Sequence, residues 1–454
     1  MNKHSFHNLL KLALLSLLCP AQLLALEYEG VEYEPGDGLS AVVVAKADGT
    51  KYSGDITIPA YISRLNKKYK VVAVSNSAFA DCTELTSVVF ANNSYVTTIE
   101  ESAFKSCTKL SSVTLPSNLT SIGAQAFRSC SALISLALPS GVTSIGASAF
   151  EECRSLPSVT IPAGVRSLPT KTFSGCKNLA QVMLPESLHT IGASAFSGCS
   201  LLSSIALPKS LVNLGEGAFS DTGLEKLVFP ASISTVPSNA FSFCDALRTV
   251  VFEEGVQQIA KDAFLCCHIL NTITVPPSLK EIADGAFTEC ELIRSLRLFK
   301  TVPGDLRVNV KAFGIRIPPE LVLHVPTGSE EAYQKASPWS QCAQIQTLPE
   351  LTVTPTAGQL QIICDEPHDQ AKFELKNVKM STVSTGTTGT DIIALPHLIS
   401  CDAEVCAFSA GCPVAIAAVP VTGSASSSQP GDVNGDEKVN LADLTALIKL
   451  LQKK

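Results

Sequence analysis

A phenylalanine recurs along the middle of the chain at intervals of 22 to 25 residues, most often 23, and it usually follows an alanine. The spacing between two of these phenylalanines also repeats: Phe, two variable residues, Cys, two variable, Leu, two variable, then an aliphatic residue on each side of one variable position. A fixed period of this length is typical of a repeat protein. The ten phenylalanines are Phe79, Phe104, Phe127, Phe150, Phe173, Phe196, Phe219, Phe241, Phe264 and Phe287.

Each repeat is expected to form one short strand and a return path. Leu136 and Leu138, one residue apart, place two apolar side chains on the same face of a strand. Pro139 then ends strand pairing because proline has no N–H to donate. A single 23-residue unit cannot bury its own apolar residues, so the units must stack and share one core. About ten stacked strands, ~4.8 Å apart, predict a long parallel sheet.

Glycines follow the second aliphatic residue of several repeats, at a place where a tight turn without a Cβ atom is expected. They are Gly123, Gly146, Gly192 and Gly215.

Nine of the 16 cysteines lie three residues after the repeat phenylalanine. In the remaining repeat this position holds Thr222, which has a similar size and cannot form a disulfide. Stacked repeats would also present their Cβ atoms in parallel, which is a poor geometry for a disulfide. Buried free thiols are therefore favoured over disulfides, and over a metal site because no histidine follows the same period. The nine are Cys82, Cys107, Cys130, Cys153, Cys176, Cys199, Cys244, Cys267 and Cys290.

With these residues in register, the units resemble the BspA-type leucine-rich repeats of surface and secreted proteins of anaerobic bacteria. The resemblance covers residues 71–313. His324 to Ser329, with Tyr333 and Trp339, resemble the segment that closes such arrays, so residues 314–349 are expected to be a C-terminal cap. Residues 26–70 are expected to be the N-terminal cap that a terminal repeat requires. The resemblance implies a mainly β leucine-rich-repeat solenoid with its parallel sheet on the concave face.

The first 25 residues have the pattern of a secretory signal peptide. Lys3 and Lys11 precede the apolar run Leu12–Leu18, and small residues follow at Ala21 and Ala25, either of which could precede the cleavage site. Secretion or display at the cell surface is therefore expected. The formal net charge is −7, and we expect no run of basic residues in the chain. Both points argue against nucleic acid or an anionic membrane as partner.

From residue 350 the repeat period gives way to the alternation of β-strands. Residues 350–421 are expected to form a small β-sandwich-like domain, and residues 422–431 a flexible linker. Cys364, Cys401, Cys406 and Cys412 could form disulfides there, with three connectivities open. The uncharged run Val405–Val421 approaches the length of a membrane span, but its prolines favour paired strands, so no transmembrane span is expected.

Residues 432–454 resemble a single dockerin-like, EF-hand-type calcium loop followed by a short helix. Oxygen ligands fall at loop positions 1, 3, 5, 7, 9 and 12, with Lys438 contributing only its main-chain carbonyl. Two features depart from the family pattern: loop position 6, which is normally glycine, is Glu437, and the usual second calcium loop is missing. One weak structural Ca²⁺ site and an acidic surface turn therefore remain as alternatives. The candidate ligands are Asp432, Asn434, Asp436, Lys438, Asn440 and Asp443.

No catalytic motif is found in the sequence, and His189, His268, His324, His368 and His397 share no spacing. The chain is therefore expected not to be an enzyme. The outward residues of the strands form two columns of small, weakly polar side chains that suit an extended partner. The named candidates are Ser112, Thr114, Ser135, Ala137, Ser158, Thr160, Gln181 and Met183, continued by Lys226 and Val228.

The resemblance implies adhesion to a host or bacterial surface protein or glycan, with no nucleic acid as partner. One alternative is an accessory component of a polysaccharide-degrading assembly, recruited through the dockerin-like tail to a cohesin-like partner. Another is a structural envelope protein without a specific ligand.

Overall fold

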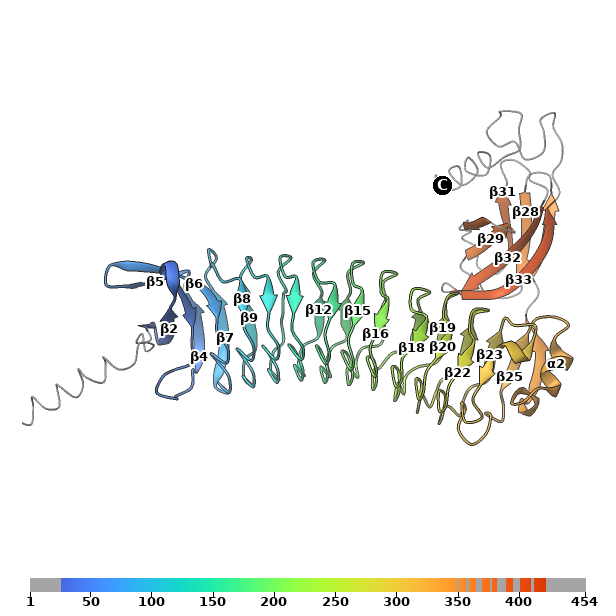
Figure 1. The fold of residues 1–454 in the computed structure, drawn as a ribbon, viewed down its shortest axis with the longest axis horizontal. Coiled ribbons are helices and arrows are strands. Elements are labelled where there is room, and N and C mark those ends of the chain that lie inside the picture. The colour runs from blue at the N-terminus through green and yellow to red at the C-terminus, as the bar shows by residue number, and fades with distance from the viewer. Residues whose placement is uncertain are drawn as a thin grey trace, which may run out of the picture. The chain divides into compact units, whose positions relative to one another are not determined.

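The computed structural model describes residues 26–348 and the backbone of seven strands between residues 351 and 421 (Figure 1). The chain divides into two compact units, residues 1–224 and 225–454. Both units are mainly β and contain stacked parallel strands, so the predicted solenoid is confirmed. The residues predicted to form the signal peptide, the linker and the calcium loop, 1–25 and 422–454, lie outside the described residues.

Most repeats contribute to two parallel ladders of strands, where one was expected. The first ladder contains the predicted aliphatic pair. The second consists of two-residue strands built on the aliphatic residue five positions before the next phenylalanine, as where Ser121–Ile122 pairs with Ser144–Ile145. The return path is therefore hydrogen-bonded from repeat to repeat as well.

In the first unit, the first ladder contains β4 (Gly54–Ile58), β7 (Leu85–Phe90), β9 (Ser112–Thr114), β12 (Ser158–Thr160) and β14 (Gln181–Met183). The second ladder contains β6 (Lys67–Val74), β8 (Thr98–Ile99), β10 (Ser121–Ile122), β11 (Ser144–Ile145), β13 (Ser167–Leu168), β15 (Thr190–Ile191) and β16 (Asn213–Leu214). At its N-terminal end it is extended by β1 (Leu26–Tyr28), β2 (Val31–Pro35), the 3-10 turn η1 (Asp37–Leu39) and β3 (Ser40–Val43), while β5 (Tyr61–Arg64) forms a hairpin with β6.

In the second unit, the first ladder runs through β17 (Lys226–Phe229), β19 (Thr249–Phe252), β21 (Thr272–Val275), β23 (Ser295–Leu298), β25 (Val322–Val325) and β26 (Gln344–Thr347). The second ladder contains β18 (Thr235–Val236), β20 (Gln258–Ile259), β22 (Glu281–Ile282) and β24 (Arg307–Val308). The 3-10 turn η2 (Pro303–Asp305), helix α2 (Glu330–Lys335) and the 3-10 turn η3 (Trp339–Gln341) complete this part of the chain.

The strands beyond residue 350 form two antiparallel sheets. One contains β27 (Leu351–Thr356), β28 (Gln359–Cys364) and β31 (Gly389–Ala394). The other contains β29 (Gln370–Leu375), β30 (Val378–Ser381), β32 (Cys401–Ser409) and β33 (Cys412–Val421). The run Val405–Val421 therefore forms paired strands, as predicted. The side chains of the four cysteines in this region lie outside the described residues.

The repeat phenylalanines form a stack in the core of each unit. In the first unit, from Phe79 to Phe219, neighbouring ring centroids lie 4.9 to 5.6 Å apart and neighbouring planes differ by no more than 9°. Tyr52 closes the N-terminal end of this stack, 4.8 Å from Phe79. In the second unit, Trp339 lies 6.3 Å from Phe313 and closes the C-terminal end. Both predicted caps thus contribute an aromatic ring that covers the terminal phenylalanine.

The turn that carries each phenylalanine has an unusual backbone. In the repeats from Phe79 to Phe287, the residues two positions before and two positions after the ring have positive φ, as at Ser148 (55°) and Glu152 (62°) around Phe150. These turns bond to the next repeat through the main chain: the Phe150 N–H donates to the Thr172 carbonyl at 2.9 Å and the Glu152 N–H to the Ser174 carbonyl at 2.7 Å. Stacking of the turns therefore satisfies their buried backbone groups.

The glycines expected at a tight turn each begin one, as where the Ala149 N–H donates to the Gly146 carbonyl at 3.3 Å. Gly123, Gly146, Gly192 and Gly215 do not have positive φ. A Cβ atom on Gly146 would instead lie 2.3 Å from the main-chain nitrogen of Ala124 in the preceding repeat. The glycine is needed here because two backbones approach closely, not because the turn is left-handed.

The first ladder of the first unit is also less regular than predicted. Two repeats lack an extended strand there: residues 135–137 form only a bridge from Ser135 to Ser112, and residues 204–206 form no strand. Both segments end in alanine, Ala137 and Ala206, where regular strands carry residues such as Thr160. Alanine has a lower strand propensity than β-branched residues, which accounts for the interruptions.

Candidate binding surface

The outward side chains of the first unit's first ladder form a strip, which we call the strand face; its strand pairing is interrupted between Ser135 and Ser158. In β9, Val113 is buried in the core while Ser112 and Thr114 are exposed, and β12 repeats this pattern with Val159 between two exposed residues. The alternation follows from the period of two in a β-strand. All eight partner-binding candidates predicted from the sequence are exposed, which is the condition for the proposed role.

The pairing of the strands aligns these side chains into two columns. Ser87 lies opposite Ser112, and Val89 lies opposite Thr114. In the same way, Thr160 lies opposite Met183. Ser87 and Val89 were not among the predicted candidates, although the spacing from Phe79 to Phe90 is the same as in the other repeats and would place them there.

The strand face carries no charge from β7 to β14. Its members are Ser87, Val89, Ser112, Thr114, Ser135, Ala137, Ser158, Thr160, Gln181 and Met183. Two of them expose apolar surface, Val89 at 43% and Met183 at 65%. Five rows at the usual strand spacing span roughly 19 Å, so the strip offers hydroxyl, amide and small apolar groups over the length of an extended ligand.

An acidic residue marks the N-terminal end of the strand face. Asp55 of β4 accepts hydrogen bonds from the hydroxyls of Ser87 and Thr86, at 2.6 and 2.7 Å. These two bonds, that from Ser87 first, lower the pKa of the Asp55 carboxyl. The carboxylate is therefore charged at neutral pH and fixes the hydroxyl of Ser87 at the edge of the strip.

In the second unit, the corresponding region has a different character. A shallow hollow of about 360 Å³ lies at the start of β19, β21 and β23, with Arg248, Asn271 and Arg294 from three successive repeats along it. Ile269 and Leu292 supply apolar lining. Arg294 pairs with Glu320 at 2.9 Å, so part of its charge is already compensated.

These repeats, with their period, their phenylalanine stack and their parallel ladders, agree with one family. Two overlapping stretches, residues 60–180 and 166–294, match the family described as the BspA type leucine rich repeat region, six copies of the repeat. The chain belongs to this family. The resemblance stated for residues 71–313 is thereby confirmed over most of its length. The dockerin-like tail lies outside the matched residues.

Solved structures of leucine-rich repeat proteins are similar to this BspA-type chain. A leucine rich cell surface protein from Faecalibacterium prausnitzii has 24% sequence identity over 72% of this chain and 96% of its own, with a TM-score of 0.49. A leucine-rich repeat protein from Bacteroides ovatus has 23% identity over 63% and 99%, with a TM-score of 0.42. The pneumococcal vaccine antigen PcpA has 17% identity over 71% and 98%, with a TM-score of 0.40. No curated protein matches the chain.

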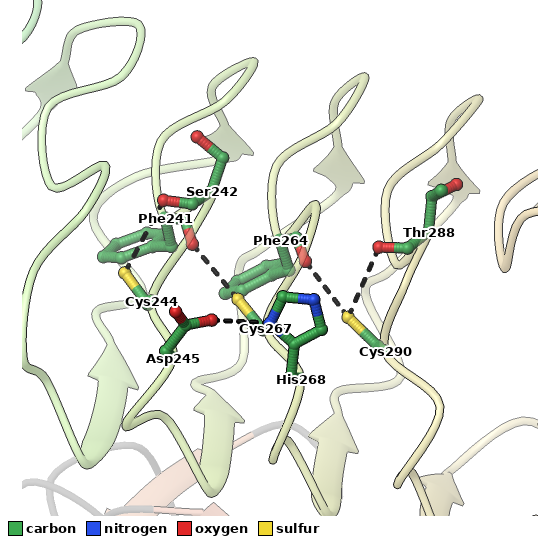
Figure 2. Close-up of polar contacts among 9 residues, drawn as sticks. All are labelled: Phe241, Ser242, Cys244, Asp245, Phe264, Cys267, His268, Thr288 and Cys290. Carbon is green, nitrogen blue, oxygen red and sulfur yellow. Dashed lines mark hydrogen bonds and ion pairs between the residues drawn. The ribbon is translucent and has the colours of Figure 1, made fainter.

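The BspA-type array contains one group of residues with the composition of a catalytic triad. Figure 2 shows His268 and Asp245, whose Nδ1 and Oδ1 atoms lie 2.6 Å apart across two repeats, beside Cys267, one of the nine repeat cysteines. The thiol of Cys267 instead donates to the main-chain carbonyl of Phe241 at 3.2 Å. Contacts with the thiols of Cys244 and Cys290, together with burial, raise the pKa of Cys267 well above its usual value. A buried, protonated thiol is a poor nucleophile, so this group is a hydrogen-bonded pair at the surface next to a core cysteine.

Within the part of the chain that the structure describes, no three His, Cys, Asp or Glu side chains form a group able to hold a metal ion. The same residues contain no helix with the length and apolar character required to cross a bilayer. The six candidate calcium ligands, Asp432 to Asp443, and the histidines His368 and His397 lie outside the described residues.

Proposed function

We propose that this protein is a non-catalytic, extracellular or cell-surface binding protein whose strand face holds an extended protein or glycan. The observation that carries the proposal is the uncharged strip from Ser87 to Met183, whose side chains are exposed except for the half-buried Ser87 and are aligned in two columns where the strands pair. Removing charged side chains from water is costly, so a strip without them loses less solvation free energy when a partner covers it.

The chemistry of the strip favours a partner that is itself extended. Ser and Thr hydroxyls both donate and accept hydrogen bonds, and they repeat at the strand spacing along the ladder. A glycan or an extended peptide presents hydroxyl or amide groups in a similar linear order. The strip is an open surface and not an enclosed pocket, which does not suit a small molecule.

The proposal is tested by placing charge and bulk on the strip. The mature protein and the double variant Thr114→Arg/Thr160→Arg are compared on arrays of immobilised extracellular-matrix proteins and glycans. The control, Thr108→Arg/Ser200→Arg, adds the same two charges at exposed turn positions away from the strand face. We expect the strand-face variant to lose binding and the control to retain it. Equal binding by both variants would contradict the proposal.

We further propose that residues 432–454 bind one Ca²⁺ ion at a structural site. The support is the chemistry of the ligand set: carboxylate and amide oxygens at the spacing of an EF-hand loop, which suits a hard cation. Glu437 stands where glycine is usual, so the proposed affinity is weak. Recruitment to a cohesin-like partner through this tail is the alternative function. A pull-down with the mature protein, with and without residues 432–454, separates it from binding by the strand face.

A further inference from the structure

The basic residues of this chain are not evenly distributed. The hairpin β5–β6 contains Arg64, Lys67, Lys68 and Lys70 within ten residues and no Asp or Glu, although the whole chain has a net charge of −7. The prediction that the chain has no basic run is wrong at this hairpin. None of its three lysines forms an ion pair with a described residue.

Two of the lysines share one face of the hairpin with a tyrosine and a serine. Tyr61 lies opposite Lys70, and Ser63 lies opposite Lys68. Directly opposed residues of an antiparallel pair point to the same side, and so do residues two apart along one strand. Lys68 and Lys70 therefore project from one surface with their Cα atoms about 6.7 Å apart.

A pair of tyrosines fixes the two ammonium groups. The Lys68 Nζ lies 3.9 Å from the ring centroid of Tyr61, and the Lys70 Nζ lies 4.8 Å from that of Tyr95. The two rings meet edge to face, with centroids 5.1 Å apart, and their hydroxyls form a 2.6 Å hydrogen bond. Cation–π contacts of this kind order a lysine side chain without neutralising its charge.

The result is a pre-ordered set of donors. In the Tyr61–Tyr95 bond one hydroxyl donates, so the other phenol keeps its proton for an external acceptor. The bond with Tyr61 is the main cause of the raised pKa of Tyr95, so that phenol stays protonated at neutral pH. Two ammonium groups, one phenol and the hydroxyl of Ser63 thus lie together on a surface where no described carboxylate pairs with the two lysines.

We propose that this hairpin face binds an anionic polysaccharide through its carboxylate or sulfate groups. Two fixed positive charges on one surface match the repeated charges of such a polymer, and the neighbouring hydroxyls match its sugar hydroxyls. A membrane is a poorer fit because the exposed apolar side chain at the tip is the single residue Leu65, which offers little area to bury in a bilayer. Nucleic acid is a poorer fit because the contacted ring faces already hold the lysines and are less open to stacking bases.

The experiment measures binding of the whole mature protein to heparin, as a sulfated polysaccharide, and to polygalacturonate, as a carboxylated one. Neutral dextran, phosphatidylserine vesicles and single-stranded DNA are the comparison ligands. We expect the first two to bind at low salt and to dissociate as salt is raised, because screening weakens exposed charge pairs.

Three variants make the test specific. Lys68→Gln/Lys70→Gln should weaken binding of heparin or polygalacturonate by about tenfold or more, since charged hydrogen bonds are lost. Lys68→Arg/Lys70→Arg should retain most of the binding, which also shows that the hairpin tolerates substitution. Lys177→Gln/Lys209→Gln removes the same charge from exposed positions elsewhere in the first unit and should have little effect. Comparable losses in both Gln variants, no binding above dextran, or tighter binding to vesicles or DNA would each overturn the proposal.

Discussion

The thiol of Cys176 donates a hydrogen bond to the main-chain carbonyl of Phe150 in the preceding repeat, across 3.1 Å. The same bond recurs from repeat to repeat, as between Cys153 and Phe127 at 3.2 Å. Thr222 differs, because its hydroxyl bonds to the Phe219 carbonyl of its own repeat. The nine repeat cysteines, which we call the ladder cysteines, therefore fill a small buried space, as predicted, and seven of them also join their repeat to the one before it.

The ladder thiols are expected to resist alkylation in the folded protein. All nine are buried free cysteines, whereas Cys266 is partly exposed. With iodoacetamide at neutral pH, mass spectrometry should find the label on Cys266 before denaturation and on the ladder cysteines only afterwards. Burial raises the pKa of Cys153 and Cys199, which lowers their reactivity further. Native labelling of most ladder positions, or disulfides among them, would show that the packing described here is wrong.

Stability is expected to fall at alkaline pH. Burial raises the pKa of Cys82 to about 11 and that of Cys176 to about 12, from 9.0. Below pH 9 both thiols are protonated in the folded and unfolded states. As pH rises above 9, the unfolded thiols lose protons that the folded ones keep, and each thiol lowers the free energy of unfolding by up to about 1.4 kcal/mol per pH unit.

Urea unfolding between pH 7 and 9.5 measures this loss in the free energy of unfolding. Ordinary tyrosines ionise only at higher pH and so contribute little to it. The Cys153→Ala/Cys176→Ala variant should show a shallower decline than the parent protein, since it removes Cys176 and also Cys153, whose pKa is likewise raised by burial. An identical slope in both proteins would exclude the thiols as its cause.

Phe150→Ala should destabilise the first unit by roughly 3 to 5 kcal/mol, because the ring stacks on both neighbours and its loss leaves a cavity. The centroid of Phe150 lies 5.5 Å from that of Phe127 and 5.3 Å from that of Phe173. Thr160→Ala, on the exposed strand face, should change stability by less than about 0.5 kcal/mol. Chemical denaturation followed by circular dichroism gives both values, and equal effects would refute the assignment of core and surface.

Gly146→Ala is expected to destabilise by about 1 to 3 kcal/mol, because the added methyl group meets the backbone of the preceding repeat. Gly304→Ala is the matched control: an added Cβ there meets nothing within 4 Å. Thermal unfolding of the two variants compares them directly. If Gly146→Ala proves as stable as the control, close approach of the repeats is not the reason for glycine at this position.

Ca²⁺ should bind weakly to the mature protein through residues 432–454. Titration calorimetry should show tighter binding for Glu437→Gly, because glycine suits the turn at loop position 6. Asp432→Ala/Asp436→Ala should abolish the heat by removing two carboxylate ligands. The absence of heat even in Glu437→Gly would mean that the segment is an acidic turn.

The sequence by itself determined the repeat, its register and its core. Phe127, Cys130 and Leu133 recur in every clean repeat, and only a stacked array can bury such residues, because one unit cannot bury them alone. Exposure of Ser112 and Thr114 followed from the two-residue period of the strand, so the strand face was also predictable. These are properties of short-range spacing, which the sequence displays directly.

The tertiary structure decided what depends on contacts between repeats. The second ladder could not be predicted, because a pair such as Ser121–Ile122 is too short to show alternation and becomes a strand only when its neighbours align. The role of Gly146 depends on its distance from Ala124, which no local pattern records. The grouping of Lys68 and Lys70 with Tyr95 joins residues that are 25 or more positions apart, and only folding brings Tyr95 to the hairpin.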